Sequence, residues 1–286
     1  MIENKILSAA VEDESGKYIG FVDTVDIMTA VIDIAEKNGT FKKKVDPDDE
    51  LINETFQLDE LDVGAIADFS GRDEFISVKT TDPLITVLAT LAEKDKHRVA
   101  VLGDDNENNG NPKFVGLISQ SGLCEYLIEE HAVQFNKLKI KLSDLHLPHS
   151  VWHVNINVKA YEAFKTMRDK RVSGLAVVDD SNTLVEVVSA SDLMLWSEWT
   201  ANEEKFRFRD MAALGLPLKE FLQNSRTQRG VEHKKPLTAS KDTLMSEAIS
   251  TMLENNVHRL FLVDEVGKAT GVVTYGDMLR YLKNLQ

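Results

Sequence analysis

The sequence predicts an α/β fold built from four copies of one short unit. In each copy an apolar strand, a turn, a second apolar strand and a short polar signature follow one another, and the signature opens a helix. The strands are rich in β-branched residues and are bounded by Asp, Asn and Gly, as strands usually are. Their continuous apolar runs suit strands that are buried on both faces. The copies cover residues 5–31, 97–127, 171–196 and 258–282.

An amphipathic helix is expected before the second, third and fourth copies. Asp82-Pro83 is typical of a helix start, because a capping residue is followed by a proline. Apolar residues then recur at the spacing of one helical face, which we interpret as core packing. These positions are Leu84, Val87, Leu88 and Leu91 in the first helix, Ala160, Ala163, Phe164 and Met167 in the second, and Leu244, Ala248, Ile249 and Met252 in the third.

Each complete unit therefore consists of a strand, a helix, two strands and a second helix. One such unit buries too little surface to be stable alone, so four units should form two pairs. We expect the division between the pairs near residues 133–150, where the pattern lapses. The first copy lacks the leading strand and helix. The predicted repeats span residues 1–36, 75–132, 151–200 and 233–286, joined by connections at 37–74, 133–150 and 201–232, of which the first and last should be partly helical.

The composition is typical of a globular protein, with 43% hydrophobic and 28% charged residues and a net charge of −14. A surface that binds duplex nucleic acid needs clustered Lys and Arg, and no long basic stripe occurs. No apolar run is long enough to span a bilayer. We therefore expect neither nucleic acid nor a membrane as a partner. The single cysteine, Cys124, cannot form an internal disulfide, so we expect a reducing compartment, the cytoplasm, with the nucleus as an alternative.

The sequence contains no pattern that predicts catalysis. It has no phosphate-binding P-loop, no H-E-x-x-H and no G-x-S-x-G, so we expect neither an enzyme nor a bound cofactor. His146, His149 and His153 could be metal ligands. They surround a proline with no cysteine nearby, so we prefer to interpret them as loop or interface histidines and expect no metal site. Cys124 follows the second signature and is interpreted as a small buried hydrophobic residue.

Two stretches carry a resemblance to a known family. They are VHRLFLVDE, which ends at Glu265, and RVSGLAVVDD, which ends at Asp180. Both resemble the cystathionine-β-synthase (CBS) repeat, and four such repeats in one chain resemble the gamma subunits of AMP-activated protein kinases, including the Snf1-type kinases of plants and lower eukaryotes. The resemblance implies two Bateman modules, each a pair of CBS repeats, in a disc-like arrangement. It also implies energy sensing, with AMP, ADP and ATP as ligands and a kinase catalytic subunit and a beta-type scaffold subunit as partners.

The family's signature is a small hydroxyl residue, two spacers and an aspartate, at the point where a strand passes into a helix. There the helix N-terminus presents backbone N–H groups to a ligand. The resemblance implies that the hydroxyl donates toward phosphate or ribose and that the carboxylate accepts both ribose hydroxyls. The first signature has Asp23 in the hydroxyl position, and the second has Gly122 in place of the carboxylate. The implied ligand residues are Ser119, Ser189 and Thr274 through hydroxyls and Asp26, Asp192 and Asp277 through carboxylates.

Basic residues at the start of the middle strand supply positive charge for the phosphates in this family. His97-Arg98 and His258-Arg259 match that pattern, and we assign Lys170-Arg171 to the same place in the third repeat. Arginine offers a planar fork for phosphate oxygens, and histidine can gain a proton beside a phosphate. Other basic residues of the family pattern are missing, since Thr251 stands where an arginine is expected. We expect triphosphate binding to be weakened more than monophosphate binding, because more charge goes unmet.

Other interpretations stay open at this point. The aspartates could simply stabilise the N-termini of their helices, by about 0.3–1 kcal/mol each, and the basic pairs could be surface ion pairs. A stand-alone CBS protein would bind adenosine ligands without a kinase. A structural scaffold would bind no nucleotide, and the altered first and second signatures would fit that function.

Overall fold

The computed structural model divides the chain into two compact units. Unit 1 comprises Met1–Val11, Ile19–Arg72 and Trp152–Lys235, and unit 2 comprises Glu12–Tyr18, Asp73–Val151 and Pro236–Gln286. Each unit is described by itself below. The structure describes residues 7–37, 63–72, 74–93, 96–103, 112–147, 151–194, 197–200, 205–208, 211–228 and 235–285.

The second, third and fourth repeats each form a sheet of three strands, in the orders β3-β4-β5, β6-β7-β8 and β11-β12-β13. The first two strands of each sheet are parallel and the last two are antiparallel, with a register shift at the same place in each. Among its described residues, the first repeat has the hairpin of β1 (Ser8–Glu12) and β2 (Tyr18–Asp23) as its strands. The other strands are β3 Ser77–Lys79, β4 Arg98–Leu102, β5 Phe114–Ser119, β6 His153–Asn155, β7 Gly174–Val178, β8 Leu184–Ser189, β11 Thr238–Ala239, β12 Arg259–Val263 and β13 Ala269–Thr274.

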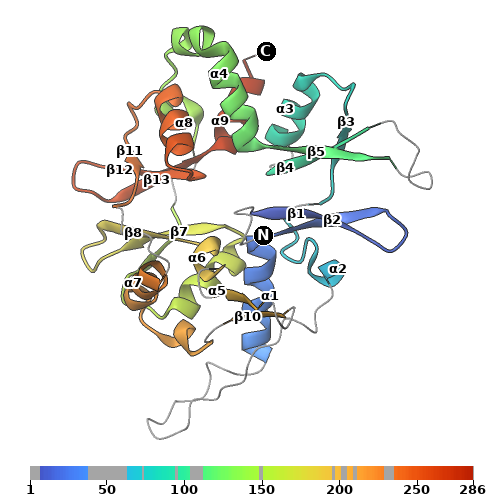
Figure 1. The fold of residues 1–286 in the computed structure, drawn as a ribbon. Coiled ribbons are helices and arrows are strands. Elements are labelled where there is room, and N and C mark those ends of the chain that lie inside the picture. Colours follow the sequence, from blue (N-terminus) through green and yellow to red (C-terminus); the bar gives the residue numbers. More distant parts are fainter. Residues whose placement is uncertain are drawn as a thin grey trace, which may run out of the picture. The chain divides into compact units, whose positions relative to one another are not determined.

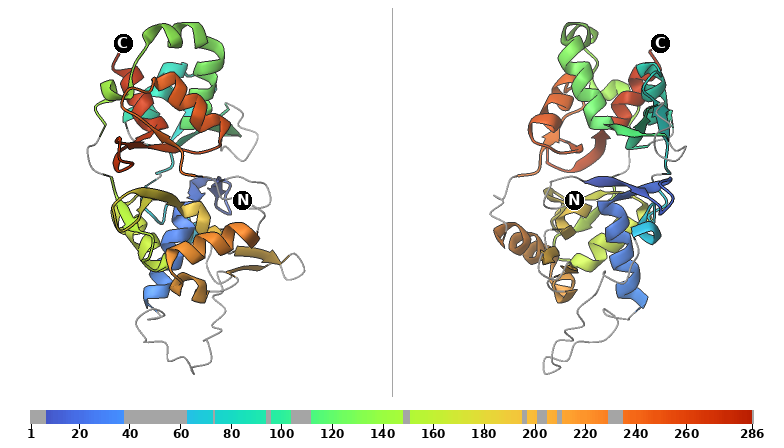
Figure 2. Two further views of the ribbon diagram at one scale, coloured as in Figure 1. Left: turned by 90° about the vertical axis from the view of Figure 1, so that its left-hand side faces the viewer. Right: turned by 45° about the vertical axis from the view of Figure 1, so that its right-hand side comes forward.

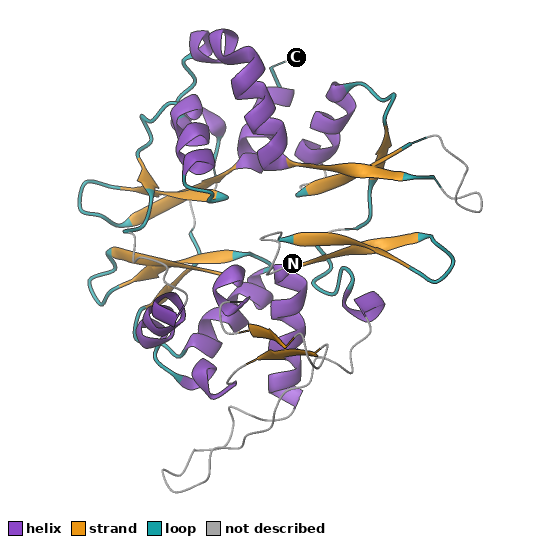
Figure 3. Ribbon diagram, in the orientation of Figure 1, coloured by secondary structure: helices purple, strands orange, loops and turns teal. Residues whose placement is uncertain are grey.

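Helices alternate with these strands in the predicted order, and in each unit they lie on one side of the strands (Figure 3). The helix that follows each signature is α1 (Thr24–Lys37), α4 (Gln120–Leu138), α6 (Ala190–Met194) or α9 (Tyr275–Lys283). The helices that precede the middle strands are α3 (Leu84–Glu93), α5 (Ala160–Lys170) and α8 (Met245–Glu254). The predicted α/β fold of repeated units is confirmed.

The connections of the repeats carry further elements. Residues 63–66 form the short helix α2 (Val63–Ile66), and residues 142–145 form the 3₁₀ helix η2 (Leu142–Leu145). The predicted end of the third repeat forms strand β9 (Ser197–Thr200), which pairs antiparallel with β10 (Lys205–Phe208) of the last long connection. That connection continues with the 3₁₀ helix η3 (Met211–Gly215) and helix α7 (Leu218–Gln228). None of the described helices is long and apolar enough to cross a membrane.

The core of unit 1 lies where α1 packs against α5 and α6 (Figures 1 and 2). The whole predicted apolar face of α5 is fully buried, from Ala160 to Met167. Phe164 of this face meets Phe221 of α7 edge to face, with ring centroids 5.4 Å apart. The last long connection therefore packs back onto the third repeat.

The core of unit 2 lies where α3 packs against α9 and α4 packs against α8 and α9 (Figure 1). Most of the predicted apolar positions of α3 and α8 are buried, and so is Cys124, as expected. Two of the positions that we predicted on the buried helix faces were wrong. Leu84 is 41% exposed because it lies in the first turn of α3, and Leu244 is the N-cap of α8 rather than part of it.

Helix packing therefore groups the first repeat with the third and the second with the fourth. We expected consecutive repeats to pair, with the division near residues 133–150. The two units do not divide the chain there, because unit 2 continues through Val151. The pairing of consecutive repeats stays a prediction. The turn of the first hairpin is part of unit 2, where Tyr18 stacks with Phe75 and packs at a tilt against Phe114, at centroid distances of 5.8 and 5.5 Å.

Candidate functional site

Equivalent backbone contacts show which residues take the basic position in each repeat. The first residue of the signature helix donates its N–H to the carbonyl of His97 in the second repeat, Ser173 in the third and Leu7 in the first, at 3.0, 3.0 and 3.3 Å. The residue that follows this carbonyl begins the middle strand and is the register partner of the signature's hydroxyl residue. These partners are Arg98 with Ser119, Gly174 with Ser189 and Arg259 with Thr274. The third repeat therefore has Ser173-Gly174 where the second and fourth have His-Arg.

Our placement of Lys170-Arg171 in the third repeat was wrong by three residues. Lys170 is the last residue of α5, and Arg171 is its C-cap in the left-handed conformation, with φ of 53°. Asn256 has the same conformation in the fourth repeat, with φ of 52°. Lys170 Nζ lies 4.3 Å from the ring centroid of Trp152. Whether Lys170 or Arg171 contacts a phosphate stays a prediction.

Unit 2 brings together the basic residues of two repeats. Although His258 as a whole is exposed, its ring lies against protein atoms. This burial, together with the positive charges of Arg259, His97 and Arg98, lowers the pKa of His258 to about 4. His97, Arg98 and Arg259 are thus close enough to His258 for their charges to repel a proton there, and these four basic residues are called the cation cluster below. An anion would relieve that repulsion.

The fourth signature adjoins this cluster through the pairing of Thr274 with Arg259. Thr274 and Asp277 form a capping box at the start of α9. Asp277 Oδ2 accepts hydrogen bonds from the backbone N–H and the hydroxyl of Thr274, at 2.9 and 2.7 Å. Asp277 Oδ1 accepts one from Arg280 at 3.0 Å, whose side chain is 45% exposed. Asp277 therefore does stabilise its helix, and it also keeps one oxygen in a partly exposed ion pair.

The second signature carries no carboxylate. Its Ser119 is the N-cap of α4 and accepts a hydrogen bond from the backbone N–H of Gly122 at 3.0 Å. The Ser119 hydroxyl also lies 3.0 Å from that of Ser121. This signature contributes hydroxyl groups and, at the neighbouring strand, the basic pair His97-Arg98.

The third signature is engaged by an arginine from the last long connection. Asp192 Oδ2 accepts hydrogen bonds from the backbone and the hydroxyl of Ser189, at 2.7 and 2.9 Å. Arg226 of α7 donates to Glu186 Oε2 at 2.7 Å, and its other terminal nitrogen lies 3.9 Å from Asp192 Oδ1. Burial raises the pKa of Asp192, and the charge of Arg226 opposes that shift. Sequence reasoning missed both Glu186 and Arg226 as parts of this site.

The first signature is engaged in a similar way. Asp26 is fully buried. Its Oδ2 accepts the backbone N–H of Asp23 at 2.8 Å, and its Oδ1 accepts the backbone N–H of Ser70 at 2.9 Å. Burial, then the charge of Asp23, raise the pKa of Asp26 to about 6. Asp23 itself takes over the capping role of the missing hydroxyl, since it accepts the backbone N–H groups of Val25 and Asp26 at 2.7 and 3.0 Å.

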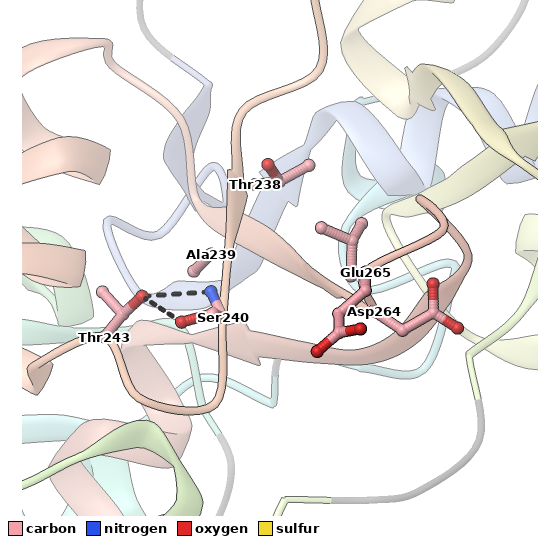
Figure 4. A pocket seen from close by; sticks show the side chains of 7 residues that line it. Thr238, Ala239, Ser240, Thr243, Asp264 and Glu265 are labelled. Carbon is pink, nitrogen blue, oxygen red and sulfur yellow. Dashed lines mark hydrogen bonds between the residues drawn. The ribbon is translucent and has the colours of Figure 1, made fainter.

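One surface hollow lies in the fourth repeat away from the signature (Figure 4). It is at the carboxyl end of β12, whereas Arg259 begins that strand. On one side of the hollow, Ser240 donates its backbone N–H to the hydroxyl of Thr243. Asp264 and Glu265 line the opposite side (Figure 4). With two acids and no base among its seven lining residues, this hollow does not suit a phosphate.

The histidines proposed as alternative metal ligands give no metal centre in the part of the chain that the structure describes. No group of three or more His, Cys, Asp or Glu side chains that could hold a metal ion occurs there. His149 lies outside the described residues. His146 is the C-cap of η2, in the left-handed conformation with φ of 50°.

Comparison with known proteins identifies the repeats. The CBS domain model matches residues 66–129, 143–198 and 229–284, which is more than half of the chain. The chain belongs to the CBS domain family. The first copy, with β1, β2 and most of α1, lies outside the matched ranges, although its strand-strand-helix order is that of the other repeats.

The relatives of this CBS protein include kinase gamma subunits, as the sequence resemblance indicated. The 5'-AMP-activated protein kinase subunit gamma of Saccharomyces cerevisiae is 23% identical over 99% of this chain and 81% of its own length. The SNF1-related protein kinase regulatory subunit gamma-1 of Arabidopsis thaliana is 26% identical over 73% of this chain and 50% of its own length. Among solved structures, protein MJ1225 of Methanocaldococcus jannaschii shares the fold, with a TM-score of 0.65 and 18% identity over 99% of this chain and 90% of that one.

Proposed function

We propose that this CBS protein binds AMP, ADP and ATP and acts as the energy-sensing subunit of an AMP-activated or Snf1-type protein kinase. The observation that carries the proposal is the cation cluster of unit 2, which combines basic residues of two repeats beside the fourth signature. Positive charges gathered from two repeats beside a signature suit a negative ligand.

The chemistry of a nucleotide fits this arrangement. Arg98 and Arg259 offer planar forks to phosphate oxygens, and His97 and His258 can gain a proton when a phosphate approaches. Asp277 Oδ1 would accept a ribose hydroxyl once Arg280 moves away. That movement costs little, because the pair is partly exposed and such pairs contribute only about 0–1 kcal/mol.

The kinase partnership is supported by the relatives, since several of them are named as kinase gamma subunits. Bound AMP, ADP or ATP would bias the contacts with a catalytic subunit and a beta-type scaffold subunit by population shift. The size of that bias is limited by the difference in nucleotide affinity between the two conformations.

Calorimetric titration tests nucleotide binding. We expect AMP to bind the wild type and to bind Arg98→Met and Arg259→Met at least about tenfold more weakly, because a hydrogen bond to a charged group contributes about 1.5–3 kcal/mol. Lys141→Met is the matched control, since Lys141 is half exposed in the same unit and pairs with Asp242. Absence of AMP, ADP and ATP binding to the folded wild type would overturn the proposal.

Copurification tests the kinase partnership separately. The tagged chain, expressed in its own cells, should bring down a protein kinase catalytic subunit together with a beta-type subunit. Nucleotide binding without these subunits would favour a stand-alone sensor of adenosine ligands.

A further inference from the structure

Both long connections return to a signature of unit 1. In the first connection, residues 63–72 lie against the first repeat, where Ser70 donates to Asp26. After α6, the last connection forms α7 and places Arg226 beside Asp192. In each case the residue that the family would use for ribose already has a partner from its own chain.

The contact in the third repeat is built at a position where the other repeats have glycine. Glu186 pairs with Val177 across the sheet, as Gly116 pairs with Val101 and Gly271 with Leu262. Its carboxylate is buried, with the side chain 7% exposed, and Arg226 is 14% exposed. Arg226 also lies 3.4 Å from the carbonyl oxygen of Val187. Two carboxylates and a carbonyl therefore satisfy this guanidinium, which leaves little of its charge for a phosphate.

The contact in the first repeat depends on close packing of the backbone. A side chain at Gly20 would meet Ala67 at 3.0 Å, so glycine is needed for the segment to approach β2. The backbone N–H of Asp68 then donates to the carbonyl of Phe21 at 2.9 Å. These contacts hold Ser70 in place, where its backbone and its hydroxyl both donate to Asp26.

Charge points in the same direction. At the two basic positions unit 1 has Leu7 and Ser8 in the first repeat and Ser173 and Gly174 in the third. Unit 1 also adds the buried carboxylate of Asp23 in one signature and that of Glu186 in the other. Within unit 1, the two family positions of each repeat therefore supply no cation for a phosphate at its signature.

The fourth signature differs from those of unit 1 both in the contacts of its aspartate and in the charge beside it. Its aspartate is engaged by Thr274 and Arg280, which belong to the same turn and helix, and no described segment from a long connection is bonded to it. The cation cluster adjoins it through Arg259.

We propose that the two long connections close the first and third signatures, through Ser70 and Arg226, and so confine nucleotide binding to the basic residues and the fourth signature of unit 2. This inference rests on the proposed nucleotide binding. It names Arg226 and Glu186 as residues that determine which repeat takes a ligand.

Three aspartate variants test the confinement by titration with AMP. Each change to asparagine keeps the size of the side chain and removes its charge. We expect Asp277→Asn to bind AMP at least about tenfold more weakly, and Asp26→Asn and Asp192→Asn to keep the stoichiometry of the wild type with an affinity within about twofold. Loss of one bound AMP in Asp26→Asn or Asp192→Asn would overturn the inference.

The double variant Glu186→Gln with Arg226→Met tests the closure itself. It removes both buried charges together, so neither is left unpaired. Adenosine is the probe, because it has a ribose and no phosphate that would need a cation. We expect the double variant to bind one more adenosine than the wild type, and the addition of Asp192→Asn to abolish that gain. If the double variant gains no adenosine, the third signature is not a closed site and the inference fails.

The two proposals can fail separately. If the wild type binds no AMP, nucleotide binding by unit 2 is wrong, while the adenosine arm still decides whether Arg226 closes the third signature. If the wild type binds AMP but Asp192→Asn loses one bound ligand, nucleotide binding stands and the confinement to unit 2 is overturned.

Discussion

Two positions of the repeat govern where negative charge can be accommodated. At the basic position, unit 2 has His-Arg in both of its repeats, whereas unit 1 has uncharged residues. At the position of the signature glycine, the third repeat has Glu186. Because these positions lie on neighbouring strands of one small sheet, substitutions there change the electrostatics of a signature without changing its backbone.

The protonation of His258 reports directly on the cation cluster. We expect its pKa, followed by NMR of the ring protons, to lie near 4 in the protein without ligand. Saturation with AMP should raise that pKa by roughly 1 or more, because the phosphate offsets the charges of Arg259, His97 and Arg98. The His258→Gln variant identifies the resonance by its loss. A pKa that stays near 4 with AMP bound would mean that the phosphate lies elsewhere.

The sequence was sufficient to locate residues whose positions follow from local spacing. The signature hydroxyls and aspartates are found at the strand-to-helix junctions where they were expected. The basic pair of the third repeat was misplaced because Lys170-Arg171 has the expected charge, while Val172-Ser173-Gly174 aligns with Val257-His258-Arg259 by backbone position. Arg226 and Ser70 could not have been predicted, because their contacts depend on how long connections fold back.

At the scale of elements, an ionic network joins the first and third repeats. Arg168 of α5 donates to Asp33 and Glu36 of α1, at 2.7 and 2.8 Å. Tyr161 donates to Glu36 at 2.8 Å, and Lys165 also forms an ion pair with it. Hydrogen bonds from Arg168, Lys165 and Tyr161 lower the pKa of Glu36 to about 2. This network orients the helix pair on which the core of unit 1 is built.

Acid should weaken this helix pair in a defined range of pH. The pKa of Glu36 falls from its ordinary value of 4.5 to about 2 on folding, so its contribution to stability is complete above 4.5 and is lost as the pH falls toward 2. We expect Glu36→Gln to lower the free energy of unfolding by about 1 kcal/mol at pH 6, since the network is partly exposed. The difference from the wild type, measured by urea unfolding, should shrink below pH 4.5.

A carboxylate without this network serves as the control. Glu254 is exposed at the end of α8 in unit 2, and Glu254→Gln should differ from the wild type by less than about 0.5 kcal/mol at each pH. A Glu36→Gln difference that stayed constant between pH 6 and pH 3 would contradict the low pKa of Glu36.

Element prediction succeeded where periodicity was strong. The apolar faces of α5 and most of α3 and α8 are buried as their spacing indicated, because a stripe at helical spacing has few alternatives to the core. It failed at helix starts, where Leu84 and Leu244 continue the pattern but precede the packed turns. The helix α7 was expected only as a helical part of a connection, and its packing against the third repeat depends on the contact of Phe221 with Phe164.

At the scale of the whole molecule, helix packing separates the two kinds of repeat. The first and third repeats, whose aspartates contact Ser70 and Arg226, share the core of unit 1. The second and fourth repeats, with the cation cluster, share the core of unit 2. Sequence order alone did not predict this grouping, since every repeat carries apolar helix faces that could pack against any other.

This separation predicts that AMP stabilises the two units unequally. A ligand at about 100 times its dissociation constant stabilises the state that binds it by about 2.7 kcal/mol, which slows the slowest amide exchange by about 100-fold. We expect hydrogen exchange measured on peptides to slow in the core of unit 2, for instance in α9 and β12, and to change by less than about threefold in α1 and α5 of unit 1. Asp277→Asn should reduce the protection of unit 2, and Asp192→Asn should leave it unchanged. Equal slowing in both units would mean either that they unfold together or that unit 1 also binds AMP. The Asp26→Asn and Asp192→Asn variants distinguish these outcomes, because one of them would reduce the protection only if AMP were bound at the first or the third signature.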